Sequence, residues 1–156
     1  MRILLITTPP NVVLGTLQML DNVELSIVDC SFAVENLHNR VSGAMESVLP
    51  DIILTYRCPY ILPYEIFSQP RLGSYNIHPS LLPKHRGLNP WQNIMNDNSQ
   101  INGVTLHKIC GQVDDGEIIL QQSYSIAGMN LEVARQTADI IASKIVLDFI
   151  DTIINV

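Results

Sequence analysis

The sequence has no apolar run long enough for a secretory signal or a membrane-spanning helix. The amino-terminal apolar stretch covers residues 3–6 and is then interrupted by Thr7, Thr8 and two prolines. A signal peptide requires roughly seven to fifteen apolar residues, and a membrane helix about 20. We therefore expect a cytoplasmic protein that has no membrane partner.

Cysteine is scarce as well, because only Cys30, Cys58 and Cys110 occur. Their wide spacing matches no common metal-binding motif, and an odd number leaves one thiol over in any disulfide scheme. We expect reduced, buried cysteines and no metal site.

Charged residues make up only 15% of the chain, whereas hydrophobic residues make up 47%. This composition excludes a disordered chain, and a length of 156 residues fits one domain over residues 1–156 with a substantial core. The formal net charge of −6 repels phosphate backbones, so we expect no nucleic-acid partner. The composition does not decide between a monomer and a homo-oligomer.

Strand-like apolar runs alternate with helix-like segments along the chain. The predicted strands are residues 1–7, 23–29, 51–55, 73–78, 102–109 and 117–125, of which the last two can pair as a hairpin. The predicted helices are residues 12–20, 32–48, 64–69, 91–95 and 130–156, with Asn130 as the N-cap of the last. The alternation predicts a single Rossmann-like α/β domain with a mostly parallel central sheet and helices on both faces.

Two polar side chains stand at the end of the fourth predicted strand, in the segment Y-N-I-H-P-S-L-L-P-K-H-R-G of residues 75–87. Strand side chains repeat every two residues, so Asn76 and His78 share a face, and Pro79 ends the strand. Open α/β folds bind ligands at the carboxyl ends of their strands. An isolated N-x-H pair is also compatible with a purely structural role.

A second segment, residues 103–121, contains G-V-T-L-H and then Asp114, Asp115 and Gly116. This order of strings, N-x-H-x-S-L-L-P followed by G-V-T and Asp-x-Gly, resembles the folate-dependent formyltransferase family. The resemblance implies a catalytic Asn76, His78 and Asp114, with 10-formyltetrahydrofolate as co-substrate. A shift of one position would assign the carboxylate to Asp115 instead, and a simple turn is the structural alternative.

Formyl transfer to an amine develops negative charge on the former carbonyl oxygen, which requires well-placed donors. Asn76 can donate from its amide, and His78 can donate if it is protonated. Asp114 would hold the imidazole, favour its charged form and direct the proton that leaves the attacking amine. This chemistry needs no metal.

The resemblance also implies binding residues around this centre. Those implied for the folate are Tyr60, Ile61, Leu62, Gln112, Val113 and Asp115, and those implied for the substrate are Ser80 and Arg86. Arg86 suits a phosphate or the glutamate tail of the donor. Without the resemblance, residues 60–63 are an apolar turn, and His107 and Trp91 have structural roles.

The chain departs from some branches of that family. Thr7, Thr8, Pro9 and Pro10 replace a glycine-rich phosphate loop, which disfavours glycinamide ribonucleotide as substrate. Members that formylate initiator tRNA carry a further carboxyl-terminal domain beyond the point where this chain ends. The sequence motifs are most similar to those of members acting on nucleotide-linked amino sugars, so we expect a small primary amine as acceptor. The alternative is a non-catalytic folate- or nucleotide-binding module, although no G-x-G-x-x-G motif supports a nucleotide.

Overall fold

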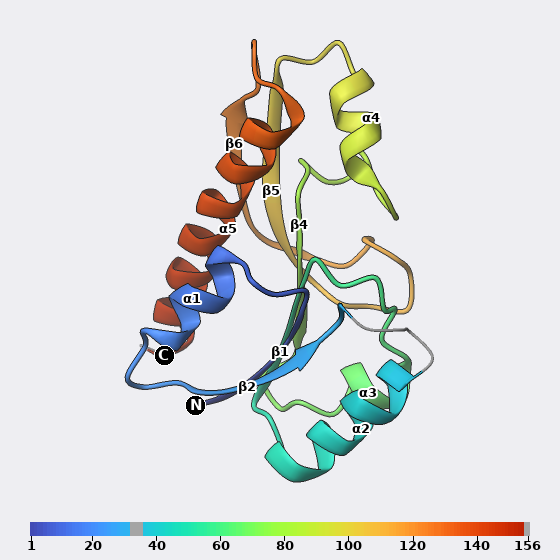
Figure 1. The fold of residues 1–156 in the computed structure, drawn as a ribbon. Coiled ribbons are helices and arrows are strands. Elements are labelled where there is room, and N and C mark those ends of the chain that lie inside the picture. The colour runs from blue at the N-terminus through green and yellow to red at the C-terminus, as the bar shows by residue number, and fades with distance from the viewer. Residues whose placement is uncertain (32–35, 155–156) are drawn as a thin grey trace.

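The computed structural model describes residues 1–31 and 36–154. Its strands form one six-stranded sheet in the order β2-β1-β3-β4-β5-β6 (Figure 1). The strands are β1 (Arg2–Thr7), β2 (Glu24–Asp29), β3 (Ile52–Tyr56), β4 (Ser74–His78), β5 (Ile101–Lys108) and β6 (Ile118–Ser125). The helices are α1 (Val12–Gln18), α2 (Leu37–Val48), α3 (Tyr64–Phe67), α4 (Pro90–Asn96) and α5 (Leu131–Ile154). Residues 32–35, where the second helix was predicted to begin, lie outside the described residues.

The pairs β1–β2, β1–β3 and β3–β4 are parallel, whereas β5 is antiparallel to β4 and β6 is antiparallel to β5. The predicted mostly parallel sheet and the predicted final hairpin are therefore confirmed. The antiparallel pairing of β4 with β5 was not predicted. It places His107 directly opposite Asn76.

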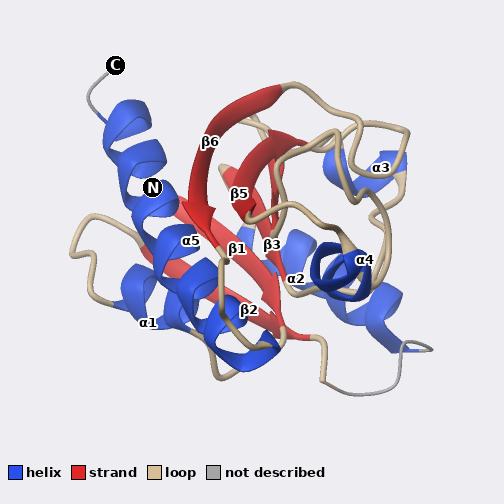
Figure 2. Ribbon diagram, turned by 90° about the horizontal axis from the view of Figure 1, so that it is seen from above, coloured by secondary structure: helices blue, strands red, loops and turns tan. Residues whose placement is uncertain are grey.

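The sheet is covered by helices on both faces, as predicted (Figure 2). Side chains of β1 alternate between the two layers: Ile3 and Leu5 pack in the cluster that includes α1 and α5, and Leu4 and Ile6 pack in the cluster that includes α2. All four are fully buried. Each such burial contributes about 1.5–3 kcal/mol to folding, which explains the apolar run at the amino terminus.

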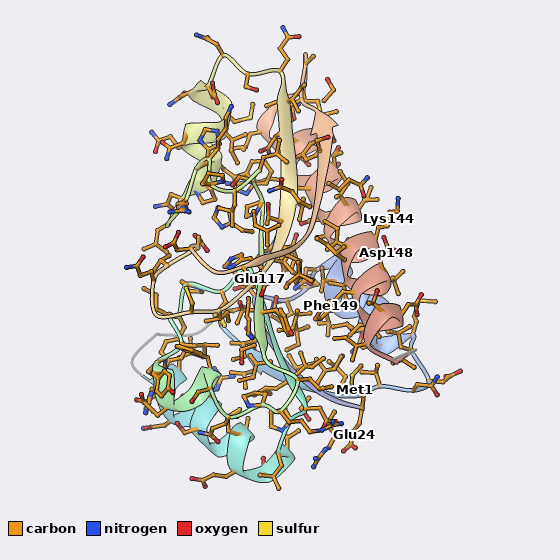
Figure 3. The ribbon with its side chains drawn as sticks, turned by 180° about the vertical axis from the view of Figure 1, so that it is seen from behind. Met1, Glu24, Glu117, Lys144, Asp148 and Phe149 are labelled. Atoms are coloured by element: carbon orange, nitrogen blue, oxygen red, sulfur yellow. The ribbon has the colours of Figure 1, made fainter. Side chains whose placement is uncertain are left out.

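Helix α5 closes one face of the sheet. It begins after Asn130, whose Oδ1 accepts a hydrogen bond from the Val133 backbone N–H at 2.9 Å, so the predicted N-cap is confirmed. Phe149 points from α5 to the sheet and meets the Tyr75 ring edge-on, with 4.6 Å between ring centroids (Figure 3). Val133 and Ile140, two apolar residues of this helix, are 42% and 65% exposed, so they do not belong to its buried face.

Within the described residues, no helix is both long enough and apolar enough to cross a membrane. All three cysteines are free. Cys30 is buried as predicted, whereas Cys58 is half-buried and Cys110 is exposed, which corrects the prediction for those two.

Candidate active site

The polar pair of the motif lies where β4 ends, beside the end of β3. Thr55 of β3 is the register partner of Asn76, and its hydroxyl donates to the Asn76 amide oxygen at 2.7 Å. His78 is the last residue of β4. Both motif side chains contact Asp114, so they share a face of the sheet as predicted.

Asp114 reaches these side chains from the loop between β5 and β6. Its backbone has a φ of 51°, in the left-handed region, and its side chain is only 8% exposed. Gly116 allows the loop to press against β5, because a Cβ at this position would lie 1.7 Å from the Lys108 carbonyl oxygen. The spacing of the Asp-x-Gly motif therefore has a steric cause.

The neighbouring acid points elsewhere. Asp115 is exposed and forms an ion pair with Arg86 at 2.6 Å. The structure thus distinguishes the two adjacent acids, and Asp114 is the one that lies beside Asn76 and His78.

The Asp114 carboxylate lies at the centre of a buried polar cluster. Its Oδ2 lies 3.3 Å from His78 Nδ1 and accepts the Gly87 backbone N–H at 2.9 Å. Its Oδ1 lies 3.2 Å from Asn76 Nδ2 and 3.3 Å from His107 Nε2. Burial raises the pKa of Asp114, but the hydrogen bond from His107, the nearby His78 and the Gly87 N–H together bring it below its ordinary value. The carboxylate is therefore ionised at neutral pH.

Both ring nitrogens of His78 face acceptors, because Nε2 lies 2.8 Å from the His85 carbonyl oxygen. Burial lowers the pKa of His78, and this outweighs the opposing effects of Asp114 and that carbonyl. The free protein thus favours the neutral ring at neutral pH, although Asp114 by itself favours the charged form, as expected. Since a carbonyl can only accept, the neutral ring carries its hydrogen on Nε2, and Nδ1 can take up a proton beside Asp114.

His107 is a member of this cluster that the sequence reasoning had given a structural role. Its Nε2 lies 3.1 Å from Asn76 Nδ2, and its Nδ1 lies 3.0 Å from the Lys108 carbonyl oxygen. The signal that could have revealed it is the strand pairing, since His107 is the register partner of Asn76 across the antiparallel β4–β5 pair.

A cleft of about 1030 Å³ opens over the cluster. Its apolar end is lined by the segment from Cys58 to Tyr64, by Phe67 and by the loop from Ile109 to Val113. The predicted folate residues Tyr60, Ile61, Leu62, Gln112 and Val113 all belong to this lining. The volume and the mixture of apolar walls with a few polar groups are typical of small-molecule sites.

Three predicted binding residues do not line the cleft. Ser80 is fully buried and donates its hydroxyl to the Lys84 carbonyl at 2.6 Å, so the hydroxyl is not available to a substrate. Arg86 and Asp115 pair with each other outside the cleft wall. These three residues shape or brace the motif loop in this structure.

The cleft is also lined by Arg57, Arg135, Asp139 and Trp91. Arg57 pairs with Asp139 at 2.5 Å, and the Tyr56 hydroxyl donates to the same carboxylate. The Arg135 guanidinium lies 5.7 Å from the centroid of the Trp91 ring and has no carboxylate partner among the described residues. Trp91 therefore belongs to the cleft as well as to the core.

No group of three or more His, Cys, Asp or Glu side chains that could hold a metal ion occurs in the part of the chain that the structure describes. The amide, the imidazole and the carboxylate lie at the rim of the sheet, where open α/β folds bind their ligands, and these groups can donate hydrogen bonds and transfer protons.

Comparison with known proteins identifies the family. Residues 4–144 match the family model described as formyl transferase. The chain therefore belongs to the formyl transferase family.

The relatives differ in what their names say they act on. A methionyl-tRNA formyltransferase from Thermotoga maritima is 44% identical over 82 residues, which cover 53% of this chain and 26% of that protein. A phosphoribosylglycinamide formyltransferase structure from Streptococcus pneumoniae superposes with a TM-score of 0.80 at 14% identity, covering 98% of each chain. A Mycobacterium tuberculosis protein proposed to be a sugar N-formyltransferase superposes with a TM-score of 0.75 at 23% identity, covering 97% of this chain and 67% of that one.

These structural likenesses establish the fold and not the substrate. The first relative shares only about a quarter of its own length with this chain. That relative is named for a tRNA. Our expectation of no nucleic-acid partner, which was based on the net charge of −6, is therefore not supported.

Proposed function

We propose that this chain transfers a formyl group from 10-formyltetrahydrofolate to a primary amine. The observation that carries the proposal is the single carboxylate of Asp114, which contacts both His78 and Asn76 under the cleft. The three groups come from two separate segments that the sheet brings together. A purely structural cluster would not need to open onto a cleft of this size.

The residues at the apolar end of the cleft suit a pterin ring. Leu62 and Phe67 offer apolar surface, and the backbone of the loop from Gly111 to Val113 offers polar groups to the ring edge. When bound there, 10-formyltetrahydrofolate supplies the activated formyl group.

Asp114 and His78 are placed to handle the proton that the attacking amine must lose. The carboxylate is ionised, and Nδ1 of the neutral His78 ring lies 3.3 Å from its Oδ2. A proton that reaches Nδ1 makes both contacts of the ring charge-assisted hydrogen bonds, one to Asp114 and one to the His85 carbonyl. His78 thus acts as the base, Asp114 stabilises its charged form, and the same proton is then available to the departing nitrogen.

Asn76 is placed to donate to the oxygen that gains negative charge. In the free protein its Nδ2 faces His107 and Asp114, at 3.1 and 3.2 Å, while Thr55 holds its amide oxygen. Donation to the formyl oxygen therefore exchanges one of these two contacts. The Thr55 hydrogen bond keeps the amide in the orientation that this exchange requires.

The acceptor amine binds, in this proposal, at the end of the cleft formed by α4 and α5. Arg57 is neutralised by Asp139, whereas Arg135 keeps its charge beside Trp91. This pair favours an acceptor that carries a negatively charged group and a ring or apolar portion. A nucleotide-linked amino sugar has both features and is the acceptor we propose.

The experiment incubates the purified protein with 10-formyltetrahydrofolate and separate amine acceptors, and follows both loss of the donor and formylation of the acceptor by mass spectrometry. The acceptors are a nucleotide-linked amino sugar, a free amino sugar, glycinamide ribonucleotide and methionyl-tRNA. We expect the nucleotide-linked amino sugar to be formylated fastest. Faster formylation of methionyl-tRNA would reassign the acceptor but keep the chemistry.

If the folate raises the melting temperature of the protein but none of these acceptors is formylated, the protein is a binding module. This result would overturn the proposed transfer. A rise with a nucleotide alone, and none with the folate, would also remove the folate site.

A further inference from the structure

The thiols of Cys30 and Cys58 lie together although they are 28 positions apart in the sequence, with 3.3 Å between their Sγ atoms. Cys30 follows β2 and Cys58 follows β3, the two strands that flank β1. Both lie just beyond the level of Thr7, where β1 ends. The sheet order therefore creates a thiol pair that the sequence spacing conceals.

The two thiols differ in what they face. Cys58 lines the cleft and its Sγ lies 3.7 Å from the Tyr60 carbonyl oxygen, in the wall proposed for the folate. Cys30 is 6% exposed and donates its S–H to Cys58. That hydrogen bond lowers the pKa of Cys58, and the same bond together with burial raises the pKa of Cys30. Cys58 is thus the reactive thiol and Cys30 is the thiol behind it.

We propose that Cys30 and Cys58 form a site of reversible oxidation, at which a peroxide closes an internal disulfide behind the candidate folate loop. The Cys58 thiolate attacks one peroxide oxygen and becomes a sulfenic acid, releasing hydroxide. Cys30 sulfur then attacks the Cys58 sulfur, and the sulfenic oxygen leaves as water with the proton of Cys30. Two thiols are oxidised and one peroxide is reduced to water. A dithiol reverses the reaction.

Closing this bond changes the cleft wall. A disulfide holds its sulfurs about 2.05 Å apart, so the two atoms must approach by about 1.2 Å. Because Cys30 is the more buried of the two, the exposed segment of Cys58 moves toward β2 and away from Tyr60. The wall from Tyr60 to Pro63 then fits a pterin less well.

Cys110 provides the matched control. It also lines the cleft and is exposed, but its Sγ contacts the Gln112 carbonyl at 3.3 Å and neither of the other thiols. A reagent that oxidises thiols merely because they are exposed would react first with Cys110.

The test treats the reduced protein with stoichiometric hydrogen peroxide, blocks the remaining thiols with N-ethylmaleimide and measures intact mass. We expect the label to fall from three equivalents to one in the wild type, with loss of two hydrogen atoms, and from two to none in Cys110→Ser. Cys30→Ser and Cys58→Ser should form no internal disulfide. Peptide mapping should then join Cys30 to Cys58.

Three labelled thiols after oxidation, a bond that includes Cys110, or only intermolecular bonds would overturn the site. The wild type and Cys110→Ser decide this even if a core variant folds poorly.

In parallel, the rise in melting temperature caused by a folate should shrink on oxidation, return with dithiothreitol, and be insensitive to peroxide in Cys30→Ser. A disulfide that leaves this rise unchanged would overturn the link to the cleft. The thiol count does not depend on formyl transfer, so it separates this proposal from the proposed function.

Discussion

Nδ1 of His78 lies 3.3 Å from Oδ2 of Asp114, and the two side chains are only 6% and 8% exposed. The pair joins the end of β4 to the loop after β5. When Nδ1 takes up a proton the contact becomes an ion pair, which burial makes stronger than the same pair at an exposed surface. The contact therefore determines where a proton can be held in the cleft.

Replacing Asp114 by Asn should lower the rate of formyl transfer about 10²–10⁴-fold, because the amide cannot stabilise a charged His78. The matched control is Asp115→Asn, which loses only an exposed pair with Arg86 and should keep nearly full activity. Initial rates at saturating donor measure both. An equal loss in the two variants would mean that the loop, and not the buried carboxylate, is what matters.

The pKa of His78, read from an NMR titration of its ring protons, should lie below the ordinary value of about 6.5 because the ring is buried. In Asp114→Asn it should fall further, since a charge that favours the imidazolium is lost. The folded state favours the neutral His78 ring. The contribution of His78 to the free energy of unfolding is therefore complete above the ordinary pKa, and it declines as the pH falls from there through the lowered pKa. A higher pKa in Asp114→Asn would contradict the role given to the carboxylate.

Gly116→Ala should destabilise the protein by about 1–3 kcal/mol and abolish most activity, because the new methyl would collide with the Lys108 carbonyl and displace Asp114. Gly111→Ala in the same loop meets no atom within 4 Å and should leave the free energy of unfolding nearly unchanged. Thermal unfolding together with the transfer assay checks both. Similar behaviour of the two alanine variants would show that the close approach of the loop to β5 is unimportant.

Arg135→Ala should raise the KM for a negatively charged acceptor about tenfold while kcat stays close to wild type, since its charge faces the cleft away from the reacting groups. Lys144→Ala removes an exposed cation from the same helix outside the cleft and should leave KM unchanged. An unchanged KM in Arg135→Ala would place the acceptor elsewhere.

Much of the fold could be predicted because local patterns determine it. The buried apolar runs at β1 and β3 and the N-cap Asn130 are signals contained within a few residues. The helical pattern predicted α5, which covers Leu131–Ile154 while residues 155–156 lie outside the described residues, but it did not predict the buried face. Val133 and Ile140 are exposed because the buried face of the helix is formed instead by Ala138, Ile141 and Ile145, which pack in the core cluster of the sheet.

The candidate site was only partly predictable, because strand order and register bring together residues that are distant in sequence. His107 enters the cluster through the antiparallel β4–β5 register, and Cys30 meets Cys58 through the order β2-β1-β3. Ser80 is the opposite case, because the motif implied that it binds the substrate. Its hydroxyl is buried against the Lys84 carbonyl, where it supports the loop.

The most direct test compares the rate of formylated product from 10-formyltetrahydrofolate in the wild type, His78→Ala and Asn76→Ala, using the acceptor that the panel identifies. We expect both variants to lose several orders of magnitude in rate while their circular dichroism spectra and cooperative unfolding stay like those of the wild type. Rates equal to the wild type in both folded variants would contradict the assignment of the reacting centre.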